Sequence, residues 1–154
     1  MRLIATHPAD YRGLTQGAIW LGMRVPPGGL EPAETLMMLA RLSRRLNDAQ
    51  GWGTWIGVSA GETAVSIAVK NPVADGMVEI GYGVAAQRRG LGHATAAVLA
   101  LLPILRGRGV ILVRADSAIA NPASGRVLTK AGFVLTGETT DPADGPLYQW
   151  QLAL

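Results

Sequence analysis

Cysteine is absent from this chain of 154 residues, and histidine occurs only at His7 and His93. Without cysteine the chain can form no disulfide, no thiolate nucleophile and no thiolate metal site. Two histidines are also too few for a histidine-rich metal centre, and they leave little material for a Ser-His-Asp triad. We therefore expect no bound metal and no cysteine-based chemistry.

Long apolar runs are equally scarce. The longest, residues 94–105, contains Pro103 and is well short of the roughly 20 apolar residues with which a helix crosses a bilayer. The first eight residues lack the apolar centre of a signal peptide. We therefore expect a cytoplasmic protein with no membrane partner, and the length favours one domain over residues 1–154.

Positive charge is concentrated in one part of the chain. The net charge is +3, yet residues 1–83 hold seven basic and seven acidic side chains, and residues 133–154 hold three acidic ones. Residues 84–132 hold seven basic side chains and one acidic side chain, and so carry the whole positive excess. Such a segment suits a polyanionic small ligand or nucleic acid. The alternative is a face of solvated arginines.

Hydrophobic periodicity predicts strands that alternate with helices. The expected strands are residues 2–6, 52–58, 63–69, 77–84, 110–115, 133–139 and 147–154. The expected helices begin near residue 7 and cover 34–50, 91–105 and 121–132. The strands between residues 52 and 84 should form an antiparallel meander, and those at 77–84 and 110–115 should be parallel neighbours. Residues 22–32 should form a loop, and Pro103 should bend or end the third helix.

The stretch from Ala86 to Thr95, here called the glycine turn, joins a predicted strand to a predicted helix and reads Ala-Gln-Arg-Arg-Gly-Leu-Gly-His-Ala-Thr. A basic turn with two glycines at a helix start offers free backbone N–H groups to an anion, aided by the helix dipole. We interpret it as a diphosphate-binding turn. The alternative is an ordinary strand-to-helix turn with arginines that face water.

A second motif covers residues 121–133 and reads Asn-Pro-Ala-Ser-Gly-Arg-Val-Leu-Thr-Lys-Ala-Gly-Phe. Asn121 and Pro122 are typical of a helix start, and Gly132 of a helix end. Residues 79–95 and this motif together resemble the GCN5-related N-acetyltransferase superfamily, above all the branch that acetylates ribosomal-protein N-termini and related amines. The first block is similar to the family's fourth strand and its Arg/Gln-x-x-Gly-x-Gly/Ala loop, and the second to the branch's Asn-x-x-Ser…Lys-x-Gly-Phe segment.

The resemblance implies an α/β (α+β) fold with a central mixed and mostly antiparallel sheet. This sheet would have about six to seven strands, with a splay between strands four and five, and about four flanking helices. Two registers fit the loop motif, residues 87–92 as Gln-x-x-Gly-x-Gly and residues 89–94 as Arg-x-x-Gly-x-Ala. The spacing from the Gly-Tyr pair at 81–82 favours the second.

The resemblance also implies acetyl-coenzyme A as the acyl donor. Its pantetheine arm would lie in the splay against the strand edge at residues 84–86, and backbone N–H groups of residues 89–94 would hold the diphosphate. The residues thereby implied in coenzyme binding are Val84, Ala86, Arg88, Arg89, Gly90, Leu91, Gly92, His93, Ala94, Asn121, Ser124 and Lys130.

Some of these residues also have an alternative role that involves no ligand. Arg88, Arg89 and Lys130 can face solvent, Asn121 can serve only as a helix cap, and His93 can be an exposed helix residue.

The reaction implied is acyl transfer from the thioester to an amine by direct attack, which requires a base because a protonated amine cannot attack. Glu79 is the carboxylate expected nearest the centre, as base or amine anchor; the alternative is an exposed residue or an arginine partner. A backbone N–H near Val84 would stabilise the oxyanion. Many family members protonate the departing thiolate with a tyrosine, but Leu128 takes that position here. Ser124 and Tyr148 are the remaining candidates, with helix-start and strand-packing roles as the alternatives.

Two other classes of function remain in view. The missing tyrosine makes a catalytically silent acyl-coenzyme A sensor or partner domain the alternative to an N-acetyltransferase. A nucleic-acid partner is not expected, because the basic residues lack interleaved aromatic residues and match no helix-turn-helix or RNA-binding signature. Edge strands make a homodimer possible. The acceptor amine stays open.

Overall fold

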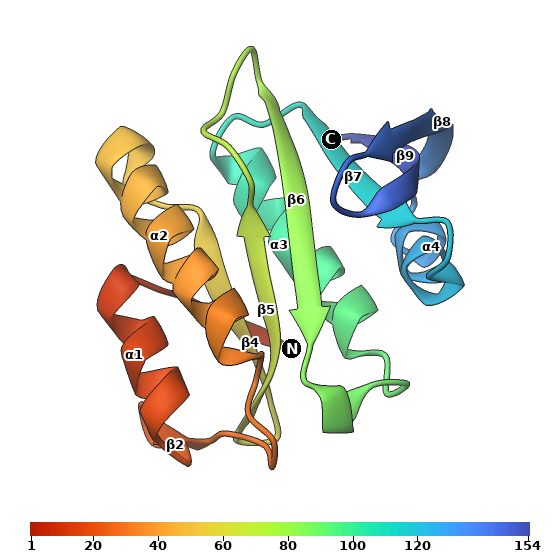
Figure 1. The fold of residues 1–154 in the computed structure, drawn as a ribbon. Coiled ribbons are helices and arrows are strands. Elements are labelled where there is room, and N and C mark those ends of the chain that lie inside the picture. The colour runs from red at the N-terminus through yellow and green to blue at the C-terminus, as the bar shows by residue number, and fades with distance from the viewer.

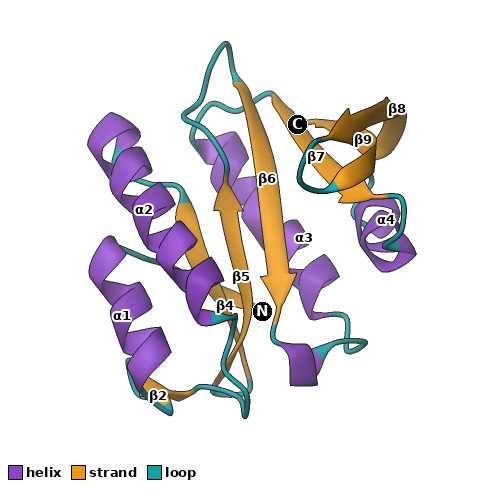
Figure 2. Cartoon of the chain, in the orientation of Figure 1, coloured by secondary structure: helices purple, strands orange, loops and turns teal.

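A computed structural model describes residues 1–154 and shows one sheet with helices on both faces (Figures 1 and 2). Its main strands lie in the order β1-β4-β5-β6-β7-β9-β8. The strands are β1 (Arg2–Ala5), β2 (Ile19–Trp20), β3 (Met23–Arg24), β4 (Thr54–Ser59), β5 (Glu62–Val69), β6 (Met77–Val84), β7 (Leu112–Ala118), β8 (Val134–Asp141) and β9 (Gly145–Ala153). The helices are α1 (Pro8–Gln16), α2 (Ala33–Gln50), α3 (His93–Gly107) and α4 (Pro122–Lys130), with a short 3₁₀ helix at Ala86–Arg88. The predicted fold class is confirmed.

The helices α1 and α2 cover one face of the sheet, and α3 covers the other (Figure 1). One hydrophobic cluster includes Leu101 of α3, and a second includes Leu14 of α1 and Leu36 of α2. Ile67 and Ala68, which are adjacent in β5, belong to the first and the second cluster respectively. This strand is therefore buried on both faces, which explains its nearly continuous apolar sequence.

The sheet opens between β6 and β7. These parallel strands pair from Met77 with Leu112 to Ile80 with Ala115. Beyond that point β6 continues to Val84 with no partner on this side, while β7 pairs with β9 alone. Figure 1 shows the two strands diverging. The predicted splay is confirmed between β6 and β7, the fourth and fifth strands of the prediction, as are the β4–β5–β6 meander and the parallel crossover through α3.

Two short strands occupy part of the segment before α2. β2 and β3 pair with each other, and Arg24 of β3 lies parallel to Glu62 at the start of β5. The prediction of a loop over residues 22–32 is therefore wrong for Met23–Arg24. A two-residue strand has no periodic signal of its own, because it is defined by its partner in β5.

The helix α3 continues past Pro103 to Gly107, so this proline does not end it. Pro103 is exposed, and Leu99, whose carbonyl loses its helical donor, is 48% exposed. Water can therefore bond the freed carbonyl on this outer side of the helix. None of the helices is both long and apolar enough to span a bilayer.

The helix α4 ends as its sequence predicts. Gly132 has a φ of +95°, its N–H donates to the carbonyl of Thr129 (3.1 Å), and the N–H of Phe133 donates to that of Leu128 (3.0 Å). This pair of hydrogen bonds is a Schellman motif, which needs a left-handed residue that glycine supplies without strain. The motif fixes where α4 stops and where β8 begins.

Candidate functional site

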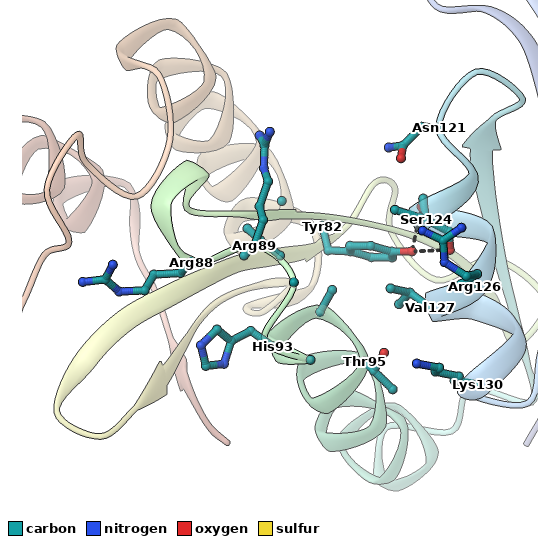
Figure 3. A pocket seen from close by; sticks show the side chains of 16 residues that line it. Tyr82, Arg88, Arg89, His93, Thr95, Asn121, Ser124, Arg126, Val127 and Lys130 are labelled. Atoms are coloured by element: carbon teal, nitrogen blue, oxygen red, sulfur yellow. Dashed lines mark hydrogen bonds between the residues drawn. The ribbon is translucent and has the colours of Figure 1, made fainter.

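A cleft of about 500 Å³ lies between the glycine turn, the first turn of α3 and the helix α4, beside the unpaired end of β6 (Figure 3). We call it the α3–α4 cleft. Of the residues implied in coenzyme binding, those that line it are Val84, Arg88, Arg89, Gly90, Gly92, His93, Ala94, Asn121, Ser124 and Lys130. Ala86 lies in the 3₁₀ helix, and the Leu91 side chain is exposed outside the cleft. The residues that the prediction missed are Tyr82, Gly83, Thr95, Ala123, Arg126 and Val127.

The glycine turn presents free donors to this cleft. Gly92 is the N-cap of α3, and the carbonyl of Gly92 accepts from the N–H of Ala96 (3.0 Å). The N–H groups of residues 89–92 donate no backbone hydrogen bond, and those of the first helical turn have no intrahelical partner. Arg89 and Ala94 line the cleft whereas Gln87 does not, which favours the register over residues 89–94.

The glycines of the turn are required by backbone conformation rather than by packing. Gly90 and Gly92 have φ values of +76° and +79°, in the left-handed region. A Cβ atom built on either residue would meet no protein atom within 4 Å. The space in front of the turn is therefore open, and glycine keeps it so.

The unpaired end of β6 presents backbone groups as well. The carbonyl of Glu79 and the N–H of Ala85 both hydrogen-bond toward β5, at 2.7 and 3.0 Å. Because backbone groups of successive strand residues point to alternate sides, the N–H and C=O of Tyr82 and Val84 point the other way, into the opening between β6 and β7. This arrangement agrees with the predicted oxyanion donor near Val84, which stays a prediction.

The basic side chains around the cleft differ in whether they form an ion pair within the protein. The Arg88 guanidinium donates from Nε (2.5 Å) and Nη2 (3.2 Å) to the Glu62 carboxylate, and these hydrogen bonds are the main reason that the pKa of Glu62 is lowered. Arg89, Arg126 and Lys130 make no ion pair. In Figure 3 Lys130 extends from α4 toward Thr95 of α3, whereas Arg88 points away from this space. The charge available to an anion thus comes mainly from the three unpaired cations.

Ser124 and Tyr82 meet across the cleft. The Ser124 hydroxyl lies 2.9 Å from the Tyr82 Oη, which also donates to the Ser124 carbonyl at 3.3 Å (Figure 3). The Ser124 hydroxyl therefore hydrogen-bonds to a tyrosine of β6 rather than to the backbone at the start of its own helix. Burial raises the pKa of Tyr82, an effect that the Ser124 hydrogen bond partly offsets. No sequence spacing could reveal this pair, because its members are 42 residues apart.

Asn121 and Leu128 differ in whether their side chains can reach a ligand in the cleft. Asn121 occupies the N-cap position as predicted, but its side chain makes no capping hydrogen bond. Its side-chain amide is therefore free to hydrogen-bond to a ligand at the edge of the cleft. Leu128, at the position where many family members have a tyrosine, is fully buried. Its side chain belongs to the core and cannot meet a ligand.

The structure does not bring Glu79 or Tyr148 to this cleft. Glu79 accepts a hydrogen bond from the Lys70 ammonium (2.6 Å), and it alternates with Val78 and Ile80, which face the α3 side of the sheet. It therefore lies on the opposite face. Tyr148 is opposite Ser117 in the β7–β9 pairing and packs against the core, as expected of a strand aromatic.

Glu31 does not line the cleft itself, but it lies beside Gly83, which does, and the sequence analysis did not single it out. It immediately precedes Pro32, the N-cap of α2, and its carboxylate accepts a hydrogen bond from the Ser66 hydroxyl (2.5 Å). Ser66 pairs with Gly83 across β5 and β6, and a Cβ on Gly83 would overlap the Glu31 carboxylate. Burial raises the pKa of Glu31, and the Ser66 hydrogen bond and the Arg89 charge lower it to a smaller extent.

Comparison with known families agrees with this geometry. The sequence matches the family described as acetyltransferase (GNAT) domain over residues 1–134. The chain belongs to the GNAT acetyltransferase family. A comparison with curated proteins finds no match.

Solved structures of GNAT proteins share the fold along nearly the whole chain. RimL, the ribosomal L7/L12 α-N-protein acetyltransferase, solved with coenzyme A, is 16% identical with a TM-score of 0.73, over 99% of this chain and 93% of that one. The aminoglycoside acetyltransferase AAC(6')-Ib, solved with coenzyme A and kanamycin, is 22% identical with a TM-score of 0.66, over 98% and 93%. The microcin C7 self-immunity acetyltransferase MccE, solved with acetyl-coenzyme A and AMP, is 15% identical with a TM-score of 0.70, over 99% and 92%. At these identities the likeness shows the fold alone.

Proposed function

We propose that this GNAT protein transfers an acetyl group from acetyl-coenzyme A to a primary amine, on a protein N-terminus or a small molecule. The observation that carries the proposal is that the open backbone edge of β6 adjoins a cleft whose glycine turn has free N–H groups. A protein that held only a phosphate would need the turn but not the open strand edge. The coenzyme A ligands of the RimL, AAC(6')-Ib and MccE structures support this choice of donor.

Each part of the cleft has a matching part of the donor. The free N–H groups and left-handed glycines of the turn suit a diphosphate, and the unpaired charges of Arg89, Arg126 and Lys130 suit its negative charge. The backbone groups of Tyr82 and Val84 suit the amides of a pantetheine arm, which would extend β6 as an added strand does.

The chemistry then follows from the thioester. The amine nitrogen attacks the carbonyl carbon, a C–N bond forms, and the C–S bond breaks to release the coenzyme thiolate. The amine loses one proton to a base, and the thiolate takes up one proton. The Val84 N–H, which points into the opening, is placed to stabilise the negative oxygen of the intermediate. Direct transfer needs no covalent enzyme intermediate, which suits a chain without cysteine.

We assign proton donation to the thiolate to the Ser124 and Tyr82 hydroxyls, which are hydrogen-bonded to each other and line the cleft. Ser124→Ala and Tyr82→Phe should each lower kcat by about tenfold, because a thiolate leaves readily without full general-acid assistance. The double variant should be no worse than either single one, since the two hydroxyls act through one hydrogen bond. Steady-state kinetics and the thermal shift produced by coenzyme A check this, and the thermal shift should persist in all three variants.

Additive losses in the double variant would contradict a shared proton path. Tyr148→Phe serves as the comparison, because Tyr148 lies on β9 and outside the cleft. A loss of kcat in Tyr148→Phe together with full activity in Tyr82→Phe would give the donor role to Tyr148 instead.

A silent acyl-coenzyme A binding protein is the second candidate, favoured by one observation: Leu128 fills the core at the position of the usual tyrosine. Both candidates are tested by mixing the protein with acetyl-coenzyme A and a panel of amines, and by measuring released thiol together with the melting temperature. Thiol release that depends on an amine supports the transferase. Stabilisation by acetyl-coenzyme A with no thiol release for any amine supports the silent binder.

A further inference from the structure

We propose that Glu31 receives the ammonium group of the acceptor and removes its proton, and that the acceptor carries a single positive charge on an otherwise uncharged body. This inference rests on the proposed transferase function and names a base and a substrate class for it.

The position of Glu31 carries the first half of the inference. Its carboxylate lies against Gly83, one residue before Val84, whose N–H points into the opening where the acyl group would lie. Glu79 is four residues from Gly83 along the same strand, a distance of about 13 Å at the usual rise of a strand. Glu31 is therefore nearer than Glu79 to the place where the acyl group would lie.

The surroundings of Glu31 suit a base. The Ser66 hydroxyl fixes one carboxylate oxygen, and the side chain is half-buried beside β6. Burial is also the main cause of its raised pKa, and a carboxylate with a higher pKa is a better proton acceptor near neutral pH. No ion pair occupies it, so it is free to meet an incoming ammonium group, in contrast to Glu79 and its Lys70 partner.

A depression of about 640 Å³ beside Glu31 supports the second part of the inference, which is the class of acceptor. It lies between the end of α1 and the segment before α2, and the residues that line it are uncharged apart from Glu31. Its proline- and glycine-rich part adjoins the glycine turn, since Gly28 lies near Gln87. A second ammonium group in this depression would have no carboxylate partner, which is costly for a group removed from water. The depression therefore fits a singly charged amine better than a polyamine or an aminoglycoside.

The test compares two sets of acceptors with acetyl-coenzyme A as donor. The singly charged set is phenethylamine and a tripeptide amide with uncharged side chains, and the multiply charged set is spermidine and kanamycin. We expect kcat/KM for the first set to exceed that for the second by about tenfold or more. A preference for spermidine or kanamycin would overturn the substrate class.

The base is tested with Glu31→Gln, with Glu34→Gln as the matched control because Glu34 is exposed on the first turn of α2. Glu31→Gln should lower kcat by about a hundredfold and leave the thermal shift with coenzyme A unchanged, whereas Glu34→Gln should keep full turnover. Glu31→Asp, which retains a carboxylate, should recover part of the activity. The retained thermal shift shows that each variant is folded.

The two possible failures are distinguishable. A wild-type protein that is stabilised by acetyl-coenzyme A but acetylates neither set overturns the proposed function and this inference with it. An active wild-type protein whose Glu31→Gln variant is equally active overturns the role of Glu31 alone, and loss of turnover in Glu79→Gln would then assign the base to Glu79.

Discussion

Replacing Gly92 by glutamate should abolish the stabilisation of the protein by acetyl-coenzyme A. The new side chain would enter the open space in front of the glycine turn and place a negative charge where the diphosphate should bind. At a ligand concentration of about 100 times Kd, the wild-type protein should gain about 2.7 kcal/mol. For a chain of this length that gain raises Tm by roughly 5–10 °C. The variant should show no shift.

Gly109→Glu is the matched control for this variant. Gly109 has a φ of +82°, close to the +79° of Gly92, and a Cβ on either residue would meet no protein atom within 4 Å. Both variants therefore have a similar conformational strain, which costs about 1–2 kcal/mol, and both add the same charge. Gly109 lies beyond the far end of α3, so its variant should keep the full thermal shift. An equal loss in both variants, or none in Gly92→Glu, would contradict diphosphate binding at the turn.

The geometry of the glycine turn could be predicted from the sequence because it is set locally. Its donors are backbone groups of consecutive residues, and their positions follow from a strand, two glycines and a helix start. The β4–β5–β6 meander and α4 were predictable for the same reason, since periodicity and helix signals act within a few residues of one another. Together with the glycine turn, these elements carry most of the residues that line the α3–α4 cleft.

Glu31 could not be predicted in this way. The placement of its carboxylate depends on Ser66 and Gly83, which come from β5 and β6 and meet only after those strands pair. In the sequence it is one acidic residue near prolines and glycines. Likewise, Arg88 forms an ion pair with Glu62, which is 26 residues earlier. A count of basic residues therefore overstates the positive charge that the cleft presents to an anion. Long-range contacts, rather than local propensity, decide which charges are free.

Proteins with this fold act on different acceptors. AAC(6')-Ib and RimL share this fold at TM-scores of 0.66 and 0.73, yet one is an aminoglycoside acetyltransferase and the other a protein α-N-acetyltransferase. One fold can carry sites for different substrates, and loops on a rigid sheet commonly decide what such a site binds. The lining of the depression beside Glu31, rather than the fold, therefore indicates the class of acceptor.

Gly83→Ala should lower turnover by about a hundredfold, as Glu31→Gln does, without weakening acetyl-coenzyme A binding. The added methyl group would overlap the Glu31 carboxylate, which must then leave Ser66. The lost hydrogen bond should reduce the free energy of unfolding by about 1–3 kcal/mol, because the buried Ser66 hydroxyl loses its partner while the displaced carboxylate regains water. Amine-dependent thiol release and chemical denaturation measure the two effects separately.

Gly81→Ala is the control for this substitution, because Gly81 lies on the same face of β6 and its backbone groups point toward β5. A Cβ there would be 3.6 Å from a Lys70 side-chain carbon, an ordinary contact, so turnover should be near that of the wild type. In a Glu31→Ala background, Gly83→Ala should cause no further loss of turnover, since no carboxylate remains to be displaced. A further loss there would mean that Gly83 serves the reaction independently of Glu31, through the backbone of β6 itself.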